Sequence, residues 1–528
     1  MRMAELPPLN AEATDLILGR QAREPANPRT REPRTANRDF DMLSSARHGP
    51  SRPVSESLSG VTPSSPPWRW VVPLAAGAAI WLLPHAGFPA PAWGLLCLLA
   101  ATIVALITRP LAAGGVVIVA LTAGSLLRLF TIQEALSGYA NVTVWLIVTA
   151  FMFARGFAES HLGERIAYLI VRRIGGSPLG LGYAIVCADL VMAPMTPSNT
   201  ARAGGILFPI TLNVARAFGS EPGPTAGRIG QFLMLALFHG DLIVSAMFLT
   251  ATAPNPLVAE LARQGAGVEV SWTQWAIAAA VPGVASLVLV PWVIFRLCPP
   301  ALHETHAAQT LAAERLEAMG PLARREWIML VVFGLVLALW LTGDWHGVPA
   351  TSVALLGVSL LLLTRVLEWH ALVEEKGAWD AFIWFGGLVT LAAQLERAGL
   401  PRAFAGAAAS AVGGWEWWWA LVTLLIIYLY AHYAFASLVA HVTAMFPAFL
   451  AAAIGLGAPP LVAALGFGFF SSLNAATTHY GTGPAPIVFG AGYVTQAAWW
   501  RIGFVISVLH LAVWLPLGFL WWKLLGLW

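Results

Sequence analysis

The sequence predicts an all-α polytopic membrane protein built from two halves of similar plan. Hydrophobic residues make up 58% of the 528 residues and charged residues only 11%, whereas charged residues are about 25% of a soluble domain. The mean hydropathy is +0.71. Apolar segments that approach the roughly 18 residues of a spanning helix recur from about residue 70 onward. In each half, one apolar segment is interrupted by proline, glycine and hydroxyl residues, and this recurrence predicts a repeated architecture.

The first 66 residues differ in composition from the rest of the chain. They are rich in proline, serine and arginine and contain few large apolar residues, so they cannot bury enough surface to offset the entropy of ordering. We expect a disordered cytoplasmic tail over 1–66, or an overlong start. Acidic residues argue against a transit peptide, among them Glu5, Glu12, Asp15, Glu24, Glu32, Asp39 and Asp41.

Residues 67–300 form the predicted first transmembrane repeat. We expect an amphipathic connection carrying Arg165, Arg172 and Arg173 to lie along the cytoplasmic interface. The expected apolar segments are 70–87, 92–108, 110–128, 141–158, 230–254 and 273–297.

The stretch from Leu190 to Pro209 is the most unusual part of this half. Pro194 and Pro197 break a helix on one side, and Gly204 with Gly205 loosens it on the other. Non-helical backbone at membrane depth is tolerated only where it is buried in protein or lines a polar cavity. The stretch is therefore predicted to be a binding site.

A polar linker at 301–326 separates this half from the predicted second transmembrane repeat at 327–528. Its charged residues make it the longest polar internal segment, and we expect it to be cytoplasmic or interfacial. The second half is expected to span the membrane near 327–342, 349–367, 380–396 and 415–435, with a last helix near 499–522.

The two interrupted segments have matching spacing. Ser198 precedes Arg202 by four residues and Pro209 by eleven, whereas Ser437 precedes His441 by four and Pro447 by ten. After each break comes an apolar span that ends in small, Thr- and Pro-rich backbone, at 252–255 and at 480–484. Paired interruptions in two halves are typical of a transporter site at a repeat interface.

Several of these motifs resemble the divalent anion/sodium symporter family. The resemblance covers about residue 68 to the C-terminus and is carried by PSNTARAGG at 197–205, TAPN at 252–255, AHYAFAS at 431–437, HVTAM at 441–445 and YGTGP at 480–484. The second-half motifs are most similar to bacterial citrate/succinate and tartrate/succinate exchangers and to plastid 2-oxoglutarate/malate translocators. The resemblance implies about eleven transmembrane helices in an inverted repeat, two re-entrant hairpins entering from opposite faces, and a homodimer with elevator-like motion.

In sodium-coupled members of that family, each hairpin carries a Ser-Asn-Thr triplet that contacts substrate and helps to form a sodium site. The first triplet is intact here as Ser198, Asn199 and Thr200. By resemblance, a sodium ion is possible at Ser198, Asn199 and the Ala251 carbonyl. The second triplet is not intact, because Leu438 and Val439 follow Ser437. This departure puts a second sodium site in doubt.

The chemistry of a polyanionic substrate suggests how the remaining residues are used. A di- or tricarboxylate must be neutralised before it crosses a low-dielectric barrier, and arginine can donate two parallel hydrogen bonds to a carboxylate. We hypothesise that Arg202 clamps one carboxylate and His441 faces another, so that an empty carrier bears uncompensated positive charge and exchange is favoured. The predicted substrate-binding residues are Ser198, Asn199, Thr200, Arg202, Thr252, Pro254, Asn255, Ser437, His441, Thr482 and Pro484.

Other ionisable residues in apolar segments have open roles. His239 and Asp241 suggest either proton coupling or a structural pair, and Asp189 is expected to support the first hairpin rather than bind ligand. Aromatic and histidine residues that flank the second break could bridge helices or contact substrate: His432, Tyr433, His479 and Tyr480.

The predicted function is therefore secondary transport of citrate, succinate, malate, tartrate or 2-oxoglutarate across a bacterial-type inner membrane, most simply by exchange. A sodium-coupled symporter of the same fold is the alternative. An intramembrane enzyme is disfavoured, because His303 and His306 lack zinc-site spacing and no Gly-x-Ser-x-Gly elbow or phosphate loop is present. The small net charge of +3 gives no support to nucleic-acid binding, and sodium is the only cofactor that the resemblance suggests.

Overall fold

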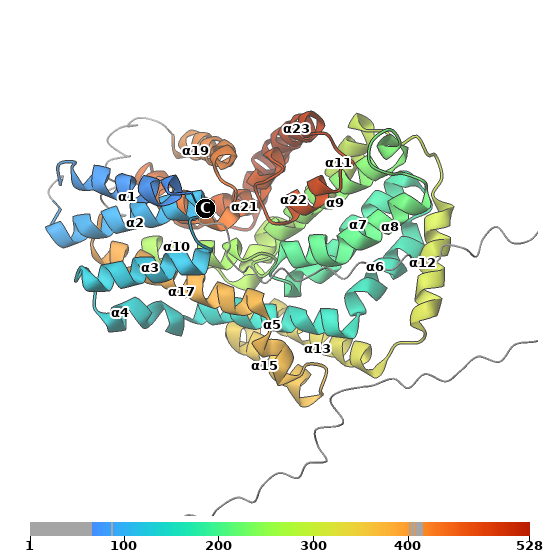
Figure 1. The fold of residues 1–528 in the computed structure, drawn as a ribbon, viewed down its shortest axis with the longest axis horizontal. Coiled ribbons are helices and arrows are strands. Elements are labelled where there is room, and N and C mark those ends of the chain that lie inside the picture. Colours follow the sequence, from blue (N-terminus) through green and yellow to red (C-terminus); the bar gives the residue numbers. More distant parts are fainter. Residues whose placement is uncertain (1–65, 86–87, 401–402, 404–405, 407–415) are drawn as a thin grey trace, which may run out of the picture. The chain divides into compact units, whose positions relative to one another are not determined.

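The computed structural model describes residues 66–85, 88–400, 403, 406 and 416–528, and the predicted tail lies almost wholly outside them. These described residues belong to one compact unit, Ser65–Trp528, and their regular structure is helical throughout (Figure 1). Within that part of the chain, ten helices are long and apolar enough to cross a membrane, by length and composition, and two shorter apolar helices accompany them. The predicted all-α polytopic class is confirmed.

Helices from both halves pack together in one group. In this group α3 and α5 of the first half pack on α17 of the second, and α5 also packs on α15. The members and short connecting helices of the group are α1 (Trp68–Trp81), α2 (Ala90–Thr108), α3 (Ala113–Leu126), α4 (Ile132–Leu136), α5 (Val142–Ser160), α13 (Arg324–Leu341), α14 (Gly343–His346), α15 (Ala350–Leu363), α16 (Trp369–Val373) and α17 (Lys376–Arg397).

The predicted amphipathic connection is α6 (Leu162–Ile174), and it packs against a helix that the sequence analysis missed. That helix, α12 (His306–Met319), lies in the linker expected at 301–326 and buries Ala308, Ala312 and Leu316. Arg165 of α6 donates to Glu326 over 3.0 Å and to the Gly320 carbonyl over 3.0 Å. The linker is thus a packed element rather than a polar loop.

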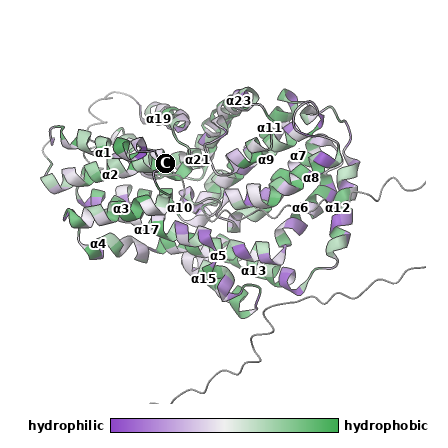
Figure 2. Cartoon of the chain, viewed as in Figure 1, coloured by the Kyte–Doolittle hydropathy of each residue, from purple (hydrophilic) through white to green (hydrophobic). Residues whose placement is uncertain are grey.

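Figure 2 shows hydrophobic residues along most helices, with hydrophilic residues interspersed on α6 and α12.

The first interrupted stretch forms a hairpin. Helix α7 (Pro178–Met192) continues into the short turn η3 (Ala193–Met195), and the chain returns through η4 (Thr200–Leu207) and α8 (Phe208–Ala217). Its two ends lie close to the linker, since Thr305 donates to the Gly176 carbonyl and α8 contacts α12. The returning segment η4 is a π-helix, a rare geometry that occurs frequently at functional sites.

The second interrupted stretch has the same form. Helix α19 (Trp417–Ala431) and the turn η6 (His432–Ala434) lead to a tip, and α20 (Leu438–Gly455) returns. The ends of this hairpin meet where Gly457 lies against Trp417. Both tips are capped alike, since Ser198 Oγ accepts from the Ala201 amide over 3.1 Å and Ser437 Oγ accepts from the Ala440 amide over 3.4 Å.

Each hairpin is followed by a broken helix. In the first half, α9 (Gly230–Met247) breaks at 248–253 before α10 (Pro254–Ala266), and in the second, α21 (Pro460–Leu473) and η7 (Asn474–Thr477) break before α22 (Pro484–Gly490). Both continuing helices start on a proline, which has no amide hydrogen to leave unpaired in the first turn. The other helices are α11 (Trp272–Leu297), α23 (Gln496–Trp514) and α24 (Pro516–Leu524), the last two replacing the single helix predicted near 499–522.

Candidate functional site

The tip of the first hairpin touches the broken helix of the second half. Asn199 Nδ2 donates to Thr482 Oγ1 over 2.9 Å, and both residues are buried. A Cβ added at Gly483 would overlap the Thr200 hydroxyl. Residues that are far apart in sequence, and that were predicted as ligands from two separate motifs, therefore meet at one place.

A second hydrogen bond joins the broken helices of the two halves. Ser472 Oγ donates to Asn255 Oδ1 over 3.3 Å, while the Asn255 amide donates to the Ser245 and Phe248 carbonyls over 2.7 and 2.9 Å. Asn255 thereby binds a carbonyl of the last turn of α9 and one of the break that follows it. Thr252, Pro254 and Pro484 are buried beside these groups.

Arg202 is the most fully bonded side chain of this region. Its Nε donates to Asp189 Oδ1, and Nη2 donates to Asp241 Oδ1 over 2.8 Å and to Ser245 Oγ over 3.0 Å. Its Nη1 donates to the carbonyls of Thr196 and Ala251 over 2.8 and 2.9 Å. A guanidinium has five N–H donors, and all five are used within the protein. The side chain is 0% exposed.

This arrangement corrects the predicted role of Arg202. The guanidinium has no donor left for a substrate carboxylate, so the clamp does not fit the structure, and the positive charge expected in an empty carrier is compensated by Asp189 and Asp241. Asp189 lies where the sequence analysis expected a support residue. The pairing could have been anticipated, because a buried arginine requires a buried partner, and Asp189 and Asp241 are acids of the flanking apolar segments.

The same bonds bear on the possible sodium site at Ser198, Asn199 and Ala251. The Ala251 carbonyl, which the resemblance assigns to the ion, accepts from the cationic Arg202 over 2.9 Å. The Asn199 amide donates to Thr482, with its nitrogen 2.9 Å from the hydroxyl oxygen. A sodium ion bound at this carbonyl would compete with the Arg202 N–H group for the same oxygen.

His441 occupies the corresponding place in the second hairpin. Its Nδ1 lies 2.9 Å from His432 Nδ1 and 2.7 Å from Asn474 Nδ2, and its Nε2 has no hydrogen-bond partner among the described residues. The ring is buried between Phe435, with centroids 4.9 Å apart, and Tyr428, at 4.3 Å. A free Nε2 leaves the predicted ligand role of His441 open, but the ring is covered in this conformation.

The histidine and aromatic side chains that flank the second hairpin tip connect different elements of the second half. His432 Nε2 lies 3.0 Å from the Gly481 carbonyl, and Tyr480 donates to the Tyr433 carbonyl over 2.9 Å. Trp500 donates to His479 Nδ1 over 3.0 Å. Of the two roles that the sequence left open for these side chains, bridging is the one seen here.

The two halves place these groups in equivalent positions. Asp189 precedes Arg202 by as many residues as Tyr428 precedes His441, and Asp241 precedes Thr252 by as many as Ser471 precedes Thr482. Tyr428 and Ser471 are hydrogen-bonded over 2.8 Å. The charged Asp–Arg–Asp triad of the first half thus corresponds to a Tyr–His–Ser set in the second.

Ser437 lies at a different cavity from the other predicted ligands. This cavity has a volume of about 260 Å³ and is lined by α2, the start of α3 and the tip of the second hairpin. Its only charged lining residue, within the described part of the chain, is Arg109, which donates through Nη2 to the Ala436 carbonyl. Sequence reasoning missed Arg109, although its place between Thr108 and Pro110 at the end of an apolar span was visible.

Arg109→Gln is expected to raise the KM for a divalent anion without unfolding the protein. Arg109 is exposed and adopts a left-handed conformation with φ 51°, so glutamine loses the charge beside Ser437 but little packing. A partly exposed cation is worth up to about 1 kcal/mol, or about two- to fivefold in KM. Arg365→Gln is the matched control, because Arg365 has φ 59° but does not line this cavity. Equal KM values for the two variants would contradict a role for Arg109.

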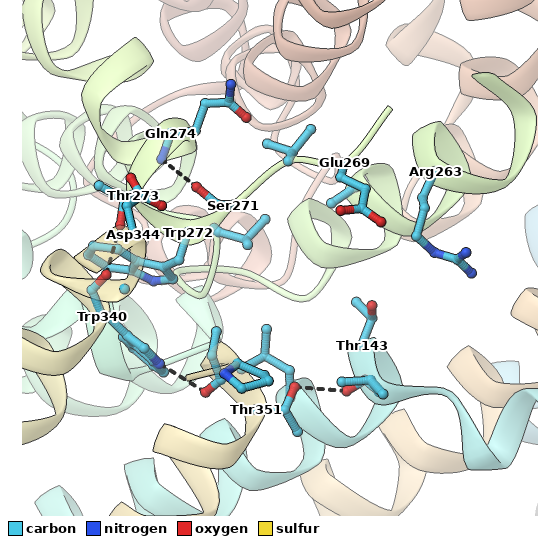
Figure 3. A pocket seen from close by; sticks show the side chains of 18 of the residues that line it. Thr143, Arg263, Glu269, Ser271, Trp272, Thr273, Gln274, Trp340, Asp344 and Thr351 are labelled. Atoms are coloured by element: carbon cyan, nitrogen blue, oxygen red, sulfur yellow. Dashed lines mark hydrogen bonds between the residues drawn. The ribbon is translucent and has the colours of Figure 1, made fainter. Parts of the chain in front are cut away.

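Another cavity, of about 1020 Å³, is lined by none of the predicted ligands. Figure 3 shows that it lies among the ends of several helices, with Glu269 and Arg263 facing Thr143 and Thr351 across it. Asn141 and Thr143 of this wall donate to the buried Glu260 of α10 over 2.8 and 3.1 Å. Because the charged lining is mainly acidic, namely Glu260, Glu269 and Asp344 against Arg263, the cavity is poorly suited to hold a polyanion.

Comparison with known proteins identifies the family. The model of the sodium:sulfate symporter transmembrane region matches residues 64–528. The chain belongs to the divalent anion/sodium symporter family. A malate transporter described as putative, YflS of Bacillus subtilis, is 48% identical to this family member over 87% of the chain and 96% of its own length.

Two further relatives extend the comparison. The chloroplast dicarboxylate transporter 1 of Spinacia oleracea is 43% identical to this protein. The match covers 88% of this chain and 83% of the length of the relative. The citrate/succinate antiporter of Escherichia coli K12 is 35% identical over 87% of the chain and 98% of its own. Family membership and these relatives agree with a transporter rather than an enzyme.

A solved structure supports the fold alone. The YdaH transporter of Alcanivorax borkumensis superimposes with a TM-score of 0.52 over 83% of this chain and 99% of its own, at 16% identity. At that identity the likeness concerns the arrangement of the helices in this family member, not its substrate.

Proposed function

We propose that this protein is a secondary transporter that exchanges di- or tricarboxylate anions across the membrane without sodium. The observation that carries the proposal is the Arg202 guanidinium, which bonds to the Ala251 carbonyl at the place assigned by resemblance to a sodium ion. The Arg202 guanidinium is a permanent part of the protein and stabilises the first hairpin. A coupling ion, by contrast, would be bound and released in each transport cycle. With no such coupling ion, net movement of one anion is driven by the gradients of the anions themselves, as in exchange.

The reason for exchange differs from the one expected from the sequence. Arg202 does not leave an empty carrier positively charged, because Asp189 and Asp241 accept from it. Support for exchange comes instead from the missing second triplet, where Leu438 and Val439 follow Ser437, and from the antiporter activity in the name of the Escherichia coli relative.

The proposed substrates are small carboxylates such as malate, succinate, citrate, tartrate and 2-oxoglutarate. Malate, succinate, citrate and dicarboxylates are named in the relatives. The side chains that remain for them are hydroxyls and an amide where the first hairpin tip meets the broken helices, namely Ser198, Asn199, Thr200, Thr252 and Thr482. His441 Nε2 lies behind Phe435, and Ser437 lies beside Arg109. By the family resemblance we also propose a homodimer in a bacterial inner membrane.

Counterflow with purified protein in liposomes tests the proposal. Vesicles loaded with unlabelled malate should accumulate labelled malate at the same rate in sodium, potassium or choline buffer. Efflux into buffer lacking any carboxylate should be at least about tenfold slower than efflux into malate, a difference of about 1.4 kcal/mol in barrier.

The runner-up is a sodium-coupled symporter, favoured by the intact triplet Ser198-Asn199-Thr200. It predicts that uptake into empty vesicles requires external sodium. An uptake rate that falls more than about tenfold when choline replaces sodium would establish the symporter and exclude our proposal. A screen of labelled carboxylates in the same vesicles then identifies the substrate.

A further inference from the structure

Two acidic side chains share one edge of the Arg202 guanidinium. Nε–H and one N–H of Nη2 point in the same direction, and such an edge ordinarily binds the two oxygens of a single carboxylate. Here Asp189 Oδ1 accepts from Nε and Asp241 Oδ1 accepts from Nη2. Carboxyl oxygens of two different residues are therefore held next to each other by one guanidinium group.

The charges of this triad do not balance if both acids are ionised. Arg202 and Asp241 are 0% exposed and Asp189 is 1% exposed, so a net charge of −1 would be buried without water. Isolated buried charges are far more costly than buried neutral groups. The second oxygen of each acid, Oδ2, has no partner among the described residues, so no further donor compensates them.

Within the described residues, the elements that surround the triad contribute no second cation. Ser245 of α9 and the carbonyls of Thr196 and Ala251 complete the shell of the guanidinium, and all three are neutral. The nearest other titratable residue of α9 is His239, which is buried and forms no hydrogen bond to the triad. The charge has to be balanced within the pair of acids.

We propose that Asp189 and Asp241 hold one proton between them, in a carboxyl–carboxylate hydrogen bond. Two carboxylates at such a separation cannot both ionise, and one shared proton removes the repulsion while giving each acid a partner. The triad is then electrically neutral and ties α7, η4 and α9 into one unit. At neutral pH the proton stays with the hairpin during transport and is not a coupling ion, because Asp189 and Asp241 are 1% and 0% exposed.

This inference rests on the proposed exchange only for its transport readout. Its direct readout is infrared spectroscopy of the purified protein, which detects the carbonyl stretch of a protonated carboxyl group whatever the substrate is. The wild type at pH 7 should show this band. Both Asp189→Asn and Asp241→Asn should lose it, because either leaves one carboxylate to balance Arg202. Asp344→Asn, a control at an exposed acid, should keep it.

Transport at alkaline pH is the second readout. As the pH rises, the wild type releases the shared proton, acquires a buried net charge of −1 and should lose exchange. The single asparagine variants have no proton to release, so the rates that they retain at pH 7 should persist at alkaline pH. The double variant leaves Arg202 without a counter-charge and should lose exchange by more than about a hundredfold.

Three results would overturn the proposal. They are the absence of a protonated-carboxyl band in the wild type at pH 7, a band that survives both single substitutions, and an alkaline loss of exchange that is identical in wild type and single variants. Should neither single variant fold, the wild-type band must still disappear at alkaline pH together with exchange. A failed exchange assay with an intact band pattern would reject the proposed function and leave the shared proton standing.

Discussion

Replacing Arg202 with methionine is expected to abolish the folded protein. Methionine is of similar length but leaves Asp189 and Asp241 buried with no cation and the Thr196 and Ala251 carbonyls without their donor. Breaking a buried ion pair from one side costs about 3–5 kcal/mol, a large part of a total stability of about 5–15 kcal/mol. The measurement is the melting temperature and the monodisperse fraction in detergent by size-exclusion chromatography.

Two variants make this expectation specific. Arg216→Met removes an arginine whose side chain is 53% exposed and should leave the melting temperature nearly unchanged. Combining Arg202→Met with asparagine at both 189 and 241 removes all the charges together and should restore folding, although not transport. An Arg202→Met protein that is stable but fails to bind carboxylate would instead favour the clamp inferred from the sequence.

The sequence predicted the fold more completely than the site. Composition and apolar spacing were sufficient for the spans, because lipid requires every spanning segment to satisfy its own backbone. Helix α12 was missed because its apolar residues, Ala308, Ala312 and Leu316, are a narrow stripe in a charged segment. Only the packing against α6 shows that this stripe is buried.

The structure brings two of the predicted ligands together and gives Arg202 a partner other than the expected one. Matching motif positions placed Asn199 and Thr482 in one site, and the structure joins them by a hydrogen bond. The role of Arg202 could not be read from its spacing to Ser198, because its partners lie 13 and 39 residues away. An arginine in an apolar segment indicated a carboxylate partner. Only the tertiary structure shows that the carboxylates belong to Asp189 and Asp241 of the protein rather than to a substrate.

The halves differ in how firmly their hairpins are anchored. The first is held by five hydrogen bonds from a charged guanidinium, and the second by His441, whose Nδ1 faces His432 and Asn474. Hydrogen bonds between charged groups are roughly twice as strong as neutral ones. The second hairpin should therefore open more readily, and hydrogen exchange should show earlier opening at 435–441 than at 196–202.

Gly483→Ala is expected to reduce exchange by about ten- to hundredfold while the protein still folds. Gly483 has φ −55° and ψ −45°, so alanine fits the backbone at this position. Its Cβ would nevertheless overlap the Thr200 hydroxyl. Overpacking of this kind costs about 1–3 kcal/mol, and the strain is relieved by moving the first hairpin tip away from Thr482.

The cost of Gly483→Ala should appear in substrate binding rather than in the melting temperature. Separating the tip from Thr482 breaks the Asn199–Thr482 hydrogen bond, which joins the ligands of the two halves. Gly490 is the last residue of α22, the helix that Gly483 precedes, and no atom within 4 Å would meet a Cβ added there. Gly490→Ala should therefore exchange malate as wild type does. Should Gly483→Ala keep the wild-type KM and rate, the substrate cannot bind between the first hairpin and α22, and the acid-lined cavity of Figure 3 would have to be reconsidered as its site.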